Sequence, residues 1–429
     1  MYMEHNKLVE WNSWWSDGKV PDELHGKERT DYTMLVGSVQ LKEVTVITGV
    51  RRSGKSTLMY QMIKKLIDSG VDASQILLVN LEDSKLHDNS LDDIYNSYRE
   101  NVNSEKKAYV FFDEIHRKKE WEAWIRSKYD KQTGDKFVIS GSSSHLLKKE
   151  YSTLLTGRNV TFEVFPLSFA EYLRFKGISI DFVKMKKGIV LEKTRIMIVK
   201  SLKEYLELGG FPQLLFTPKT YKKTILAQYF DDILYKDIVD RFNLQPHKAK
   251  ELALFFMTNV THPFSLRTLR NSLGLSYDTT KDYVSAFKEV FLFFTLDHFS
   301  YSFKEQKTLP QKIFCIDNGL RNAVSFTFSK DEGKLAENMI LVELKRREYD
   351  IYYWKSKGEV DFIVKHKNNS LTAINVSFTD EINEREIRSL VEFKKDFSQT
   401  KELVLITRNT EKNIEGVKLV PAWKWLLEV

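Results

Sequence analysis

An octapeptide with two glycines constrains this chain more than any other feature. Residues 49 to 56 read Gly-Val-Arg-Arg-Ser-Gly-Lys-Ser, which matches the pattern G-x-x-x-x-G-K-[ST] at every position. The β-branched run Val44 to Thr48 precedes it, and the amphipathic stretch Lys55 to Ser69 follows it. A strand, a glycine loop and a helix in this order are typical of a phosphate-binding loop. A solvated glycine turn is the alternative, and the flanking strand and helix disfavour it.

The loop predicts a site for ATP and Mg²⁺. Glycines let consecutive backbone N–H groups converge on phosphates, and the helix that follows contributes its positive end. Lys55 is expected to contact the β- and γ-phosphates, and Ser56 to coordinate the metal. Thr57 is expected to bond near the α-phosphate or to cap the turn. The residues predicted to bind the nucleotide are Gly49, Arg51, Arg52, Ser53, Gly54, Lys55, Ser56 and Thr57.

A pair of carboxylates ends a later apolar strand. Tyr109 to Phe112 is followed by Asp113 and Glu114, which is the arrangement of a Walker B element. Asp113 is expected to hold the metal, directly or through water, and Glu114 to activate the attacking water as general base. Acidic pairs also begin helices, so the upstream phosphate loop is what favours catalysis here. His116 is assigned a structural role.

Two further positions are predicted to contact the nucleotide. The strand Phe137 to Ser140 leads into a run of serines, of which Ser142, with Ser140 as second choice, is predicted to sense the γ-phosphate. A helix cap is the alternative role. Arg158 follows a glycine turn and is predicted to act in trans, as a catalytic arginine delivered to the γ-phosphate of a neighbouring copy. That role implies a homo-oligomer, and a solvated surface arginine is the alternative.

Composition indicates a globular protein of several domains. Because 429 residues exceed what one hydrophobic core usually organises, about two to four domains are expected. The net charge of +7 is small beside 66 Lys and Arg and 59 Asp and Glu, so a basic partner surface is permitted but not demanded. The single cysteine, Cys315, excludes an intrachain disulfide and fits a reducing, cytoplasmic compartment. The apolar runs are too short for a membrane span, and Met1 to Trp15 does not read as a signal peptide.

Changes in pattern divide the chain into five predicted parts. Strand and helix signals alternate after Leu35, as they do in a parallel sheet with helices on its faces. A helical region follows, interrupted at Gly209 to Pro212. The predicted parts are an N-terminal segment (1–34), a P-loop α/β core (35–165), a helical lid (166–246), a winged helix (247–330) and a small α/β tail (331–429).

Together these motifs resemble those of a known family. The chain resembles the bacterial and archaeal AAA-family ATPases that carry a C-terminal domain called DUF4143, and the resemblance covers nearly the whole chain. It implies an AAA+ base, a helical lid, a winged helix and a tail of the PD-(D/E)xK nuclease-like fold. The segments that carry it are Gly49 to Thr57, Phe112 to Ile115, Ile139 to Ser143, Leu155 to Arg158, Phe165 to Phe169, Gly209 to Pro212, Lys236 to Ile238, Ile316 to Leu320 and Glu359 to Phe362.

The resemblance also implies that the tail has lost nuclease chemistry. Glu337 and Asp361 match the first helix and the hairpin strand of that fold. An active member needs a carboxylate and a lysine two residues apart on the next strand, to bind metal and activate water. This chain has Asn375 and Ser377 there. Lys365 could act as a migrated lysine, but the carboxylate would still be missing, so an inert domain used for docking or substrate contact is predicted.

We therefore expect an ATPase whose nucleotide state is coupled to movement of the C-terminal domains. The alternative is a nucleotide-gated binding module for a protein or DNA partner, with slow turnover. The second helix of the predicted winged helix, Tyr277 to Glu289, has nearly balanced charge. Phosphate binding needs clustered cations, so this helix weakens the case for DNA without excluding it.

Overall fold

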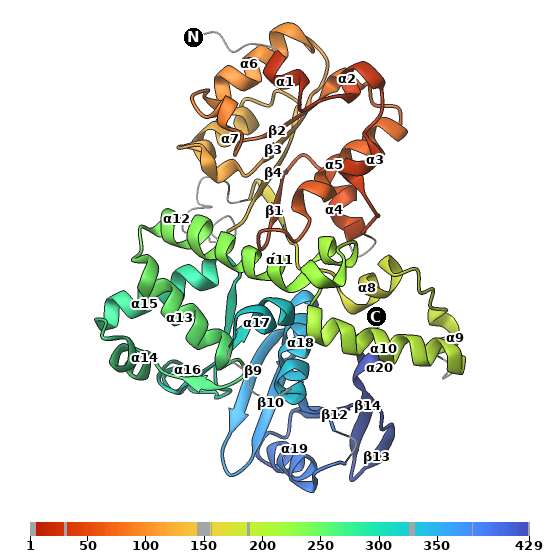
Figure 1. Ribbon diagram of the computed structural model, residues 1–429, viewed down its shortest axis with the longest axis vertical. Helices are drawn as coiled ribbons and strands as arrows, with labels where there is room; N and C mark the ends of the chain where they lie inside the picture. Colours follow the sequence, from red (N-terminus) through yellow and green to blue (C-terminus); the bar gives the residue numbers. More distant parts are fainter. Residues whose placement is uncertain are drawn as a thin grey trace. The chain divides into compact units, whose positions relative to one another are not determined.

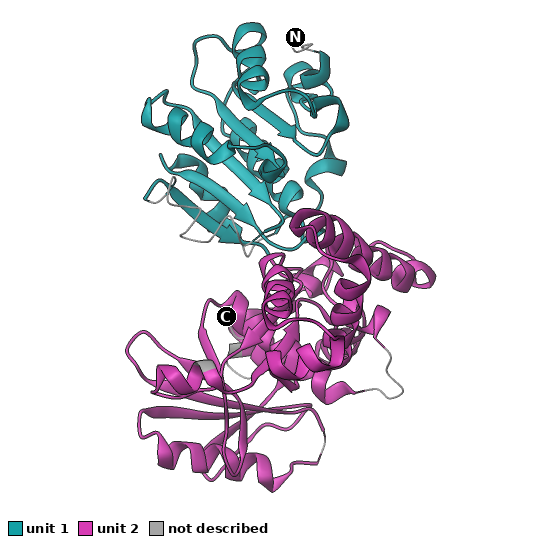
Figure 2. Cartoon of the chain, turned by 90° about the vertical axis from the view of Figure 1, so that its left-hand side faces the viewer, with its two compact units in different colours: residues 1–164 teal, residues 165–429 magenta. Residues whose placement is uncertain are grey.

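The computed structural model describes residues 6–29, 32–143, 155, 157–186, 189–325, 331–379 and 381–427. The chain forms two compact units, residues 1–164 and residues 165–429, coloured separately in Figure 2. The five predicted parts divide the chain more finely than these units do and stay a prediction. Within the described ranges, no helix has the length and apolar character that a membrane crossing requires.

A five-stranded parallel sheet organises the first unit. Its strands are β1 (Val44–Thr48), β2 (Ile76–Asn80), β3 (Tyr109–Asp113), β4 (Lys136–Gly141) and β5 (Asn159–Glu163). They lie in the order β2-β3-β4-β1-β5, and each neighbouring pair is parallel. The predicted fold class, a P-loop α/β core with a parallel sheet, is confirmed.

Helices cover both faces of this sheet, because successive residues of a strand point to opposite sides. Val44 and Val46 share a core with α6 (Leu91–Asn101) and α7 (Trp121–Asp130), whereas Ile47 packs with α5 (Lys55–Asp68). Figure 1 shows α6 and α7 on one side of the strands and α5 on the other. All residues of β1 are buried, as expected for a parallel strand covered on both faces.

The N-terminal segment belongs to the first unit and covers the edge strand β2. The indole N–H groups of Trp14 and Trp15 donate to the carbonyl of Ile76 at 3.2 and 2.7 Å. Asn12 donates to the carbonyl of Leu78 at 2.9 Å and accepts from its N–H at 2.7 Å. These bonds satisfy backbone groups that an edge strand otherwise exposes. The segment contains α1 (Asn6–Val9), α2 (Trp14–Asp17) and α3 (Asp22–His25), and α4 (Thr33–Gly37) follows it.

The second unit begins with a helical region and ends with a mixed sheet. Its helices are α8 (Phe169–Phe175), α9 (Phe182–Lys186), α10 (Glu192–Leu208), α11 (Lys219–Asp232), α12 (Asp240–Phe242), α13 (Pro246–Thr258), α14 (Leu266–Leu273), α15 (Tyr277–Glu289), α16 (Phe303–Thr308), α17 (Asn318–Val324), α18 (Glu332–Arg346), α19 (Glu384–Asp396) and α20 (Ala422–Leu427). A π-helical stretch, Ile233–Val239, joins α11 to α12.

Two sheets lie within the second unit. Their strands are β6 (Pro263–Phe264), β7 (Phe293–Leu296), β8 (Gln311–Cys315), β9 (Asp350–Lys355), β10 (Glu359–Lys365), β11 (Leu371–Ser377), β12 (Thr400–Thr407), β13 (Lys412–Ile414) and β14 (Val417–Pro421). The small sheet has the order β6-β8-β7, and the large one β13-β14-β12-β11-β10-β9. One face of the large sheet packs with α19, and the other shares a core with α8, α10, α18 and α20. The helices α8 and α10 of the predicted lid therefore share a core with the tail.

A buried aspartate explains why two separate glycine motifs occur in this unit. The carboxylate of Asp317 accepts from the N–H of Gly210 at 2.7 Å and from that of Gly319 at 2.8 Å. A Cβ added to Gly209 would lie 1.9 Å from Asp317 Oδ1, so a side chain does not fit there. Burial raises the pKa of Asp317 to about 6, although the N–H donors oppose the shift. The contact joins the end of α10 to the start of α17.

Candidate nucleotide-binding site

The loop between β1 and α5 has backbone conformations that favour glycine at two points. The φ angle is 144° at Gly49 and 103° at Gly54. A Cβ at Gly49 would lie 2.1 Å from the carbonyl oxygen of Val164. The loop therefore runs too close to the backbone that follows β5 for position 49 to carry any side chain. Helix α5 begins directly afterwards, at Lys55. Its free N-terminal N–H groups therefore adjoin the loop.

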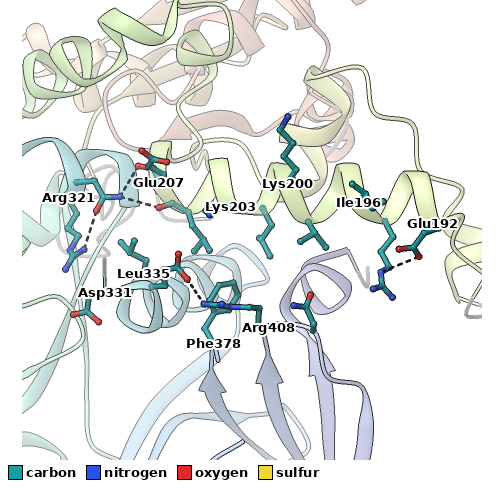
Figure 3. Close-up of a pocket in the computed structure, with 17 residues that line it drawn as sticks. Glu192, Ile196, Lys200, Lys203, Glu207, Arg321, Asp331, Leu335, Phe378 and Arg408 are labelled. Atoms are coloured by element: carbon teal, nitrogen blue, oxygen red, sulfur yellow. Dashed lines mark hydrogen bonds and ion pairs between the residues drawn. The ribbon is translucent and has the colours of Figure 1, made fainter. Parts of the chain in front are cut away.

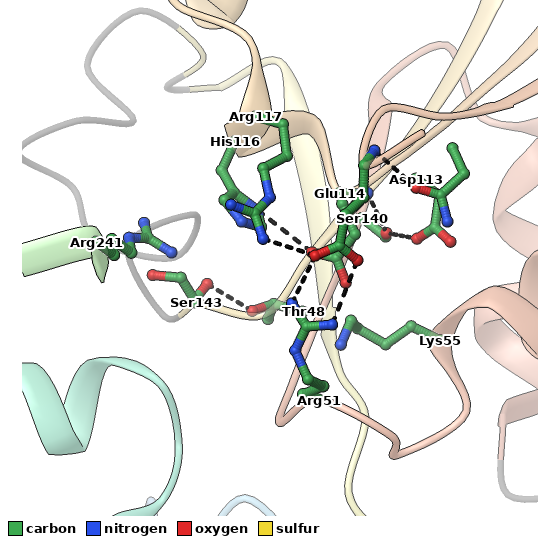
Figure 4. Close-up of polar contacts among 12 residues, drawn as sticks. Thr48, Arg51, Lys55, Asp113, Glu114, His116, Arg117, Ser140, Ser143 and Arg241 are labelled. Atoms are coloured by element: carbon green, nitrogen blue, oxygen red, sulfur yellow. Dashed lines mark hydrogen bonds and ion pairs between the residues drawn. The ribbon is translucent and has the colours of Figure 1, made fainter. Parts of the chain in front are cut away.

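Lys55 is held inside this loop by neutral partners. Its side chain is 4% exposed, and its ammonium donates to the carbonyls of Gly49 at 3.0 Å and Val50 at 3.2 Å. Figure 4 shows it beside the residues of the β3 and β4 ends. Carbonyl dipoles solvate a cation without neutralising its charge, so Lys55 can still attract an anion.

Asp113 joins three elements at the carboxyl end of β3. Its carboxylate accepts from Ser56 Oγ of α5 at 2.5 Å and from Ser140 Oγ of β4. Burial raises the pKa of Asp113, and the neighbouring charge of Glu114 adds to the shift, while both hydroxyl donors and Lys55 oppose it. Two hard oxygen ligands are thus brought together, which is the donor set that Mg²⁺ prefers.

Glu114 lies beside this pair in an uncommon backbone conformation. Its φ is 56°, in the left-handed region, and its N–H donates to Ser140 Oγ at 3.1 Å. The side chain is 10% exposed, and its Oε2 lies 3.4 Å from Nδ1 of His116. A non-glycine residue in this region marks a constrained turn, which holds the carboxylate next to Asp113. His116, assigned a purely structural role from the sequence, contacts this carboxylate directly.

A carboxylate that sequence inspection missed links the loop to the Walker B turn. Glu82 accepts from Arg51 at 3.0 Å and from Arg117 at 2.6 Å. Burial raises the pKa of Glu82, but the two guanidinium groups outweigh it and lower the pKa to about 2. Glu82 stands two residues beyond β2, at the sheet edge where β1 and β3 also end. That position was the signal that could have found it.

Two hydroxyls near the loop have no partner among the residues that the structure describes. Within those residues, Oγ of Ser53 and Oγ of Ser142 are both buried without a hydrogen bond. Buried hydroxyls are usually bonded, so both groups are suited to a polar ligand. The carboxyl end of β4, which leads to Ser142, lies between β1 and β3. Of the two serines proposed from the sequence, Ser140, the second choice, is the one that donates to Asp113.

The other predicted loop residues lie at its surface. Arg52 is exposed with φ 69°, and Thr57 is half-buried in the first turn of α5. A further contact comes from the N-terminal segment, where the buried Arg29 donates to the carbonyl of Ser53 at 2.8 Å. No local pattern around Arg29 signals this contact, because the two residues meet only in the folded chain.

Three family models match successive parts of the chain. They are an AAA domain over residues 41–173, a domain of unknown function, DUF8612, over 199–331, and DUF4143 over 332–425. An uncharacterized protein of Methanocaldococcus jannaschii is 31% identical over 407 residues, which cover 90% of this chain and 88% of that protein. The chain belongs to the AAA–DUF4143 family of archaea and bacteria. The match to the AAA domain supports the interpretation of this chain as a nucleotide-binding ATPase of the AAA type.

Other similarities add relatives without adding a known role. An uncharacterized protein of Haemophilus influenzae Rd is 29% identical over 404 residues, which cover 91% of this chain and 96% of that protein. Among solved structures, that of PCH-2 from C. elegans covers 66% of this chain and 70% of its own, with 14% identity. Its TM-score of 0.26 is too low to support any argument.

Arg158 of the AAA domain does not lie at the nucleotide loop of its own chain. Its carbonyl accepts from the N–H of Val44, at the start of β1, whereas the loop follows the end of that strand. The guanidinium Nε donates to Asp130 at 2.8 Å. Arg158 is therefore at the opposite edge of the sheet from Lys55.

The DUF4143 domain gathers its acidic residues around a lysine from β8. Nζ of Lys312 lies 2.7 Å from Glu359, 3.0 Å from Glu337 and 3.5 Å from Asp361. Its side chain is 2% exposed. Burial alone lowers the pKa of Lys312, but the three carboxylates outweigh burial and raise it. An ammonium thus occupies the centre of this acidic cluster, to which the predicted nuclease-like fold contributes Glu337 and Asp361.

Asn375 stands where the predicted nuclease motif would need a carboxylate, and both the oxygen and the nitrogen of its side-chain amide are hydrogen-bonded. Its Oδ1 accepts from the N–H of Asp361 at 3.0 Å, and its Nδ2 donates to Glu386 at 2.9 Å and Ser389 at 3.0 Å. Across the described residues, no group of three or more His, Cys, Asp or Glu is arranged to hold a metal ion. The loss of nuclease activity stays a prediction.

Proposed function

We propose that this chain binds ATP with Mg²⁺ at the loop Gly49 to Ser56 and hydrolyses it. The observation that carries the proposal is the 2.5 Å contact between Ser56 and Asp113, with Lys55 and Glu114 on either side. A hydroxyl and a carboxylate for the metal, an ammonium for the phosphates and a second carboxylate for water are the groups that phosphoryl transfer to water requires.

Each group has a defined task in the proposed reaction. Lys55 binds the β- and γ-phosphate oxygens, and Glu114 accepts a proton from the attacking water. The water oxygen forms a bond to the γ-phosphorus, the bond from that phosphorus to the bridging oxygen breaks, and ADP and phosphate leave. Ser56 and Asp113 would hold Mg²⁺, which neutralises phosphate charge when bound.

Glu114→Gln tests hydrolysis. The amide keeps the shape but cannot accept the proton, so phosphate release at saturating Mg-ATP is expected to fall by about 10²- to 10⁴-fold while ATP affinity is retained. Glu100→Gln, on the exposed face of α6, is the control and should release phosphate as the wild type does. If wild type and Glu114→Gln turn over equally slowly, the chain is instead a nucleotide-gated binding module.

We also propose that Arg158 acts in trans. Its distance from its own loop and its exposed pairing with Asp130 support a role at a neighbouring copy. Arg158→Ala should then lower turnover by about 10³-fold. Mixing the Arg158→Ala and Lys55→Ala chains should restore part of the activity, because an interface between them can join the intact loop of the first to the intact arginine of the second. Arg126→Ala, which also pairs with Asp130, is the control. A fully active monomer would exclude the role.

DNA is a second candidate partner. Helices α13, α14 and α15 with the sheet β6-β8-β7 have the element order of a winged helix, and Arg267, Arg270 and Lys281 are exposed on it. Against DNA stands the balanced charge of α15. Duplex DNA should stimulate phosphate release, and its binding should weaken steeply with salt, if this surface is used. If the partner is instead a protein that binds when the C-terminal domains move, DNA is expected neither to stimulate phosphate release nor to show salt-dependent binding.

A further inference from the structure

A cavity of about 790 Å³ lies within the second unit, apart from the nucleotide site. Helix α10 forms one wall, and residues from the ends of α17, β11 and β12 and the start of α18 form the others. Figure 3 shows α10 along one side, with Leu335, Phe378 and Arg408 facing it and Arg321 at one end. The volume falls within the range of small-molecule sites, roughly 300–1,000 Å³.

The walls of this cavity are largely apolar. Ile196, Leu202 and Leu206 of α10 face the cavity together with Leu335 and Phe378. Ile196 is 59% exposed, although a helix that packs against a core normally buries its apolar side chains. An apolar body seated against α10 would bury this surface.

One buried cation in the cavity lacks a counter-charge among the described residues. Arg321 is 2% exposed, and within that part of the chain its Nε has no hydrogen-bond partner and its Nη1 donates only to the side-chain amide oxygen of Asn322, at 3.3 Å. In the described parts of the chain, no carboxylate oxygen lies within 4.0 Å of its nitrogens. A guanidinium cannot shed its proton in a protein, and a buried charge without a partner is unfavourable.

The remaining charges around the cavity favour an anion. Five cationic side chains and four carboxylates are among the described residues that line it. Three of the carboxylates already pair with a cation: Glu192 with Arg195 at 3.7 Å, Glu332 with Arg408 at 2.5 Å and Asp331 with Lys334 at 2.7 Å. Glu207 is then the one lining carboxylate left opposite Lys200, Lys203 and Arg321, so the cavity carries surplus positive charge.

We propose that this cavity binds a small anionic amphiphile, a molecule with a carboxylate or phosphate head and an apolar body. The head would bind Arg321, because a carboxylate and a phosphate each present two oxygens that can accept hydrogen bonds from one guanidinium. The body would lie on Ile196, Leu206 and Phe378. Arg321 directly follows Asp317-Asn318-Gly319-Leu320, so the aspartate that joins α10 to α17 also fixes the backbone that carries the arginine.

Calorimetric titration of the full chain with decanoate and with decyl phosphate, each below its micelle concentration, tests the proposal. Both are expected to bind with one molecule per chain. Decanol, which lacks the charge, and inorganic phosphate, which lacks the body, should each bind at least about tenfold more weakly. Equal binding of decanol and decanoate would overturn the role of Arg321. Binding only to vesicles that contain anionic lipid would overturn the small molecule in favour of a membrane surface.

Two variants locate the site. Arg321→Gln removes the charge, and Ile196→Asp places a carboxylate on the apolar wall, so each should weaken both probes by about tenfold or more. The matched controls are Arg388→Gln, exposed on α19, and Ile189→Asp, at a residue that is 57% exposed outside the cavity; both should bind as the wild type does. If Arg321→Gln does not fold, Ile196→Asp decides. Losses no larger than those of the controls would refute the proposal.

Discussion

The AAA domain and the second unit each bury a lysine near carboxylates, but they hold it in different ways. Lys55 donates to the neutral carbonyls of Gly49 and Val50. Lys312 lies within 3.5 Å of three carboxylates. The two side chains are almost equally buried, at 4% and 2% exposure, so what distinguishes them is the charge of their partners.

This difference indicates that the site of Lys55 can bind and release a charged ligand, whereas the charge of Lys312 is already paired within the protein. A lysine solvated by dipoles keeps its charge for an incoming anion, whereas a lysine surrounded by carboxylates is already neutralised. Lys312 also comes from β8, whereas Glu337, Glu359 and Asp361 come from α18 and β10. The cluster therefore links β8 of the small sheet to β10 of the large sheet and to α18, and it pairs its carboxylates with a cation of the same chain.

Removing Lys312 should have the largest effect. Lys312→Met leaves several buried carboxylates without their cation, which is expected to lower the free energy of unfolding by about 3–5 kcal/mol. Urea unfolding of the full chain, followed by the fluorescence of its tryptophans, measures the loss. The matched control is Lys365→Met, because Lys365 is exposed at the end of β10. If the two variants lose the same stability, the cluster does not depend on its lysine.

Removing Lys55 should have a smaller effect on stability and a specific effect on the ligand. Its present partners are carbonyls that water can replace, but it supplies a charged hydrogen bond to phosphate, so Lys55→Ala should weaken Mg-ATP binding by about 10- to 100-fold. Equilibrium dialysis with labelled ATP measures the affinity. Lys65→Ala, exposed on the same helix, should bind ATP normally. Unchanged affinity in Lys55→Ala would remove the basis of the proposed site.

The local parts of this comparison could be predicted from the sequence. Strand β1 and the start of α5 lie where the run Val44 to Thr48 and the loop predicted them, because β-branched residues, glycines and helix periodicity act over a few residues. Strands β3 and β4 agree with the predicted strands Tyr109 to Phe112 and Phe137 to Ser140 to within one residue at each end. Strand β5 was missed, since its sequence Asn-Val-Thr-Phe-Glu mixes polar and apolar residues and every one is only partly buried.

The contacts that distinguish the two sites could not be predicted in this way. Lys312 is 25 residues from Glu337 and 49 from Asp361. Its strand, β8, lies in the part of the chain that is predicted as a winged helix, not in the predicted tail. Arg29 meets the phosphate loop across 24 residues. Likewise Gly209 to Pro212 is recognised in the sequence only as an interruption of the helical region. The folded chain shows why glycine is needed there: the carboxylate of Asp317 leaves no space for a side chain at Gly209. Such pairs depend on tertiary packing, which leaves no periodic pattern in the chain.

The smallest predicted effect concerns Glu82, which pairs with two arginines at the rim of the nucleotide site. Its folded pKa of about 2 lies below the ordinary value of 4.5, so its pairing stabilises the fold above about pH 4.5 and is lost as the pH falls towards 2. Because its side chain is 35% exposed, the contribution should be about 1 kcal/mol or less. Glu82→Gln should therefore unfold more easily than the wild type at pH 7, and the difference should shrink as the pH approaches 2. Urea unfolding at several pH values measures it, and a difference independent of pH would mean that Arg51 and Arg117 do not act on Glu82 through its charge.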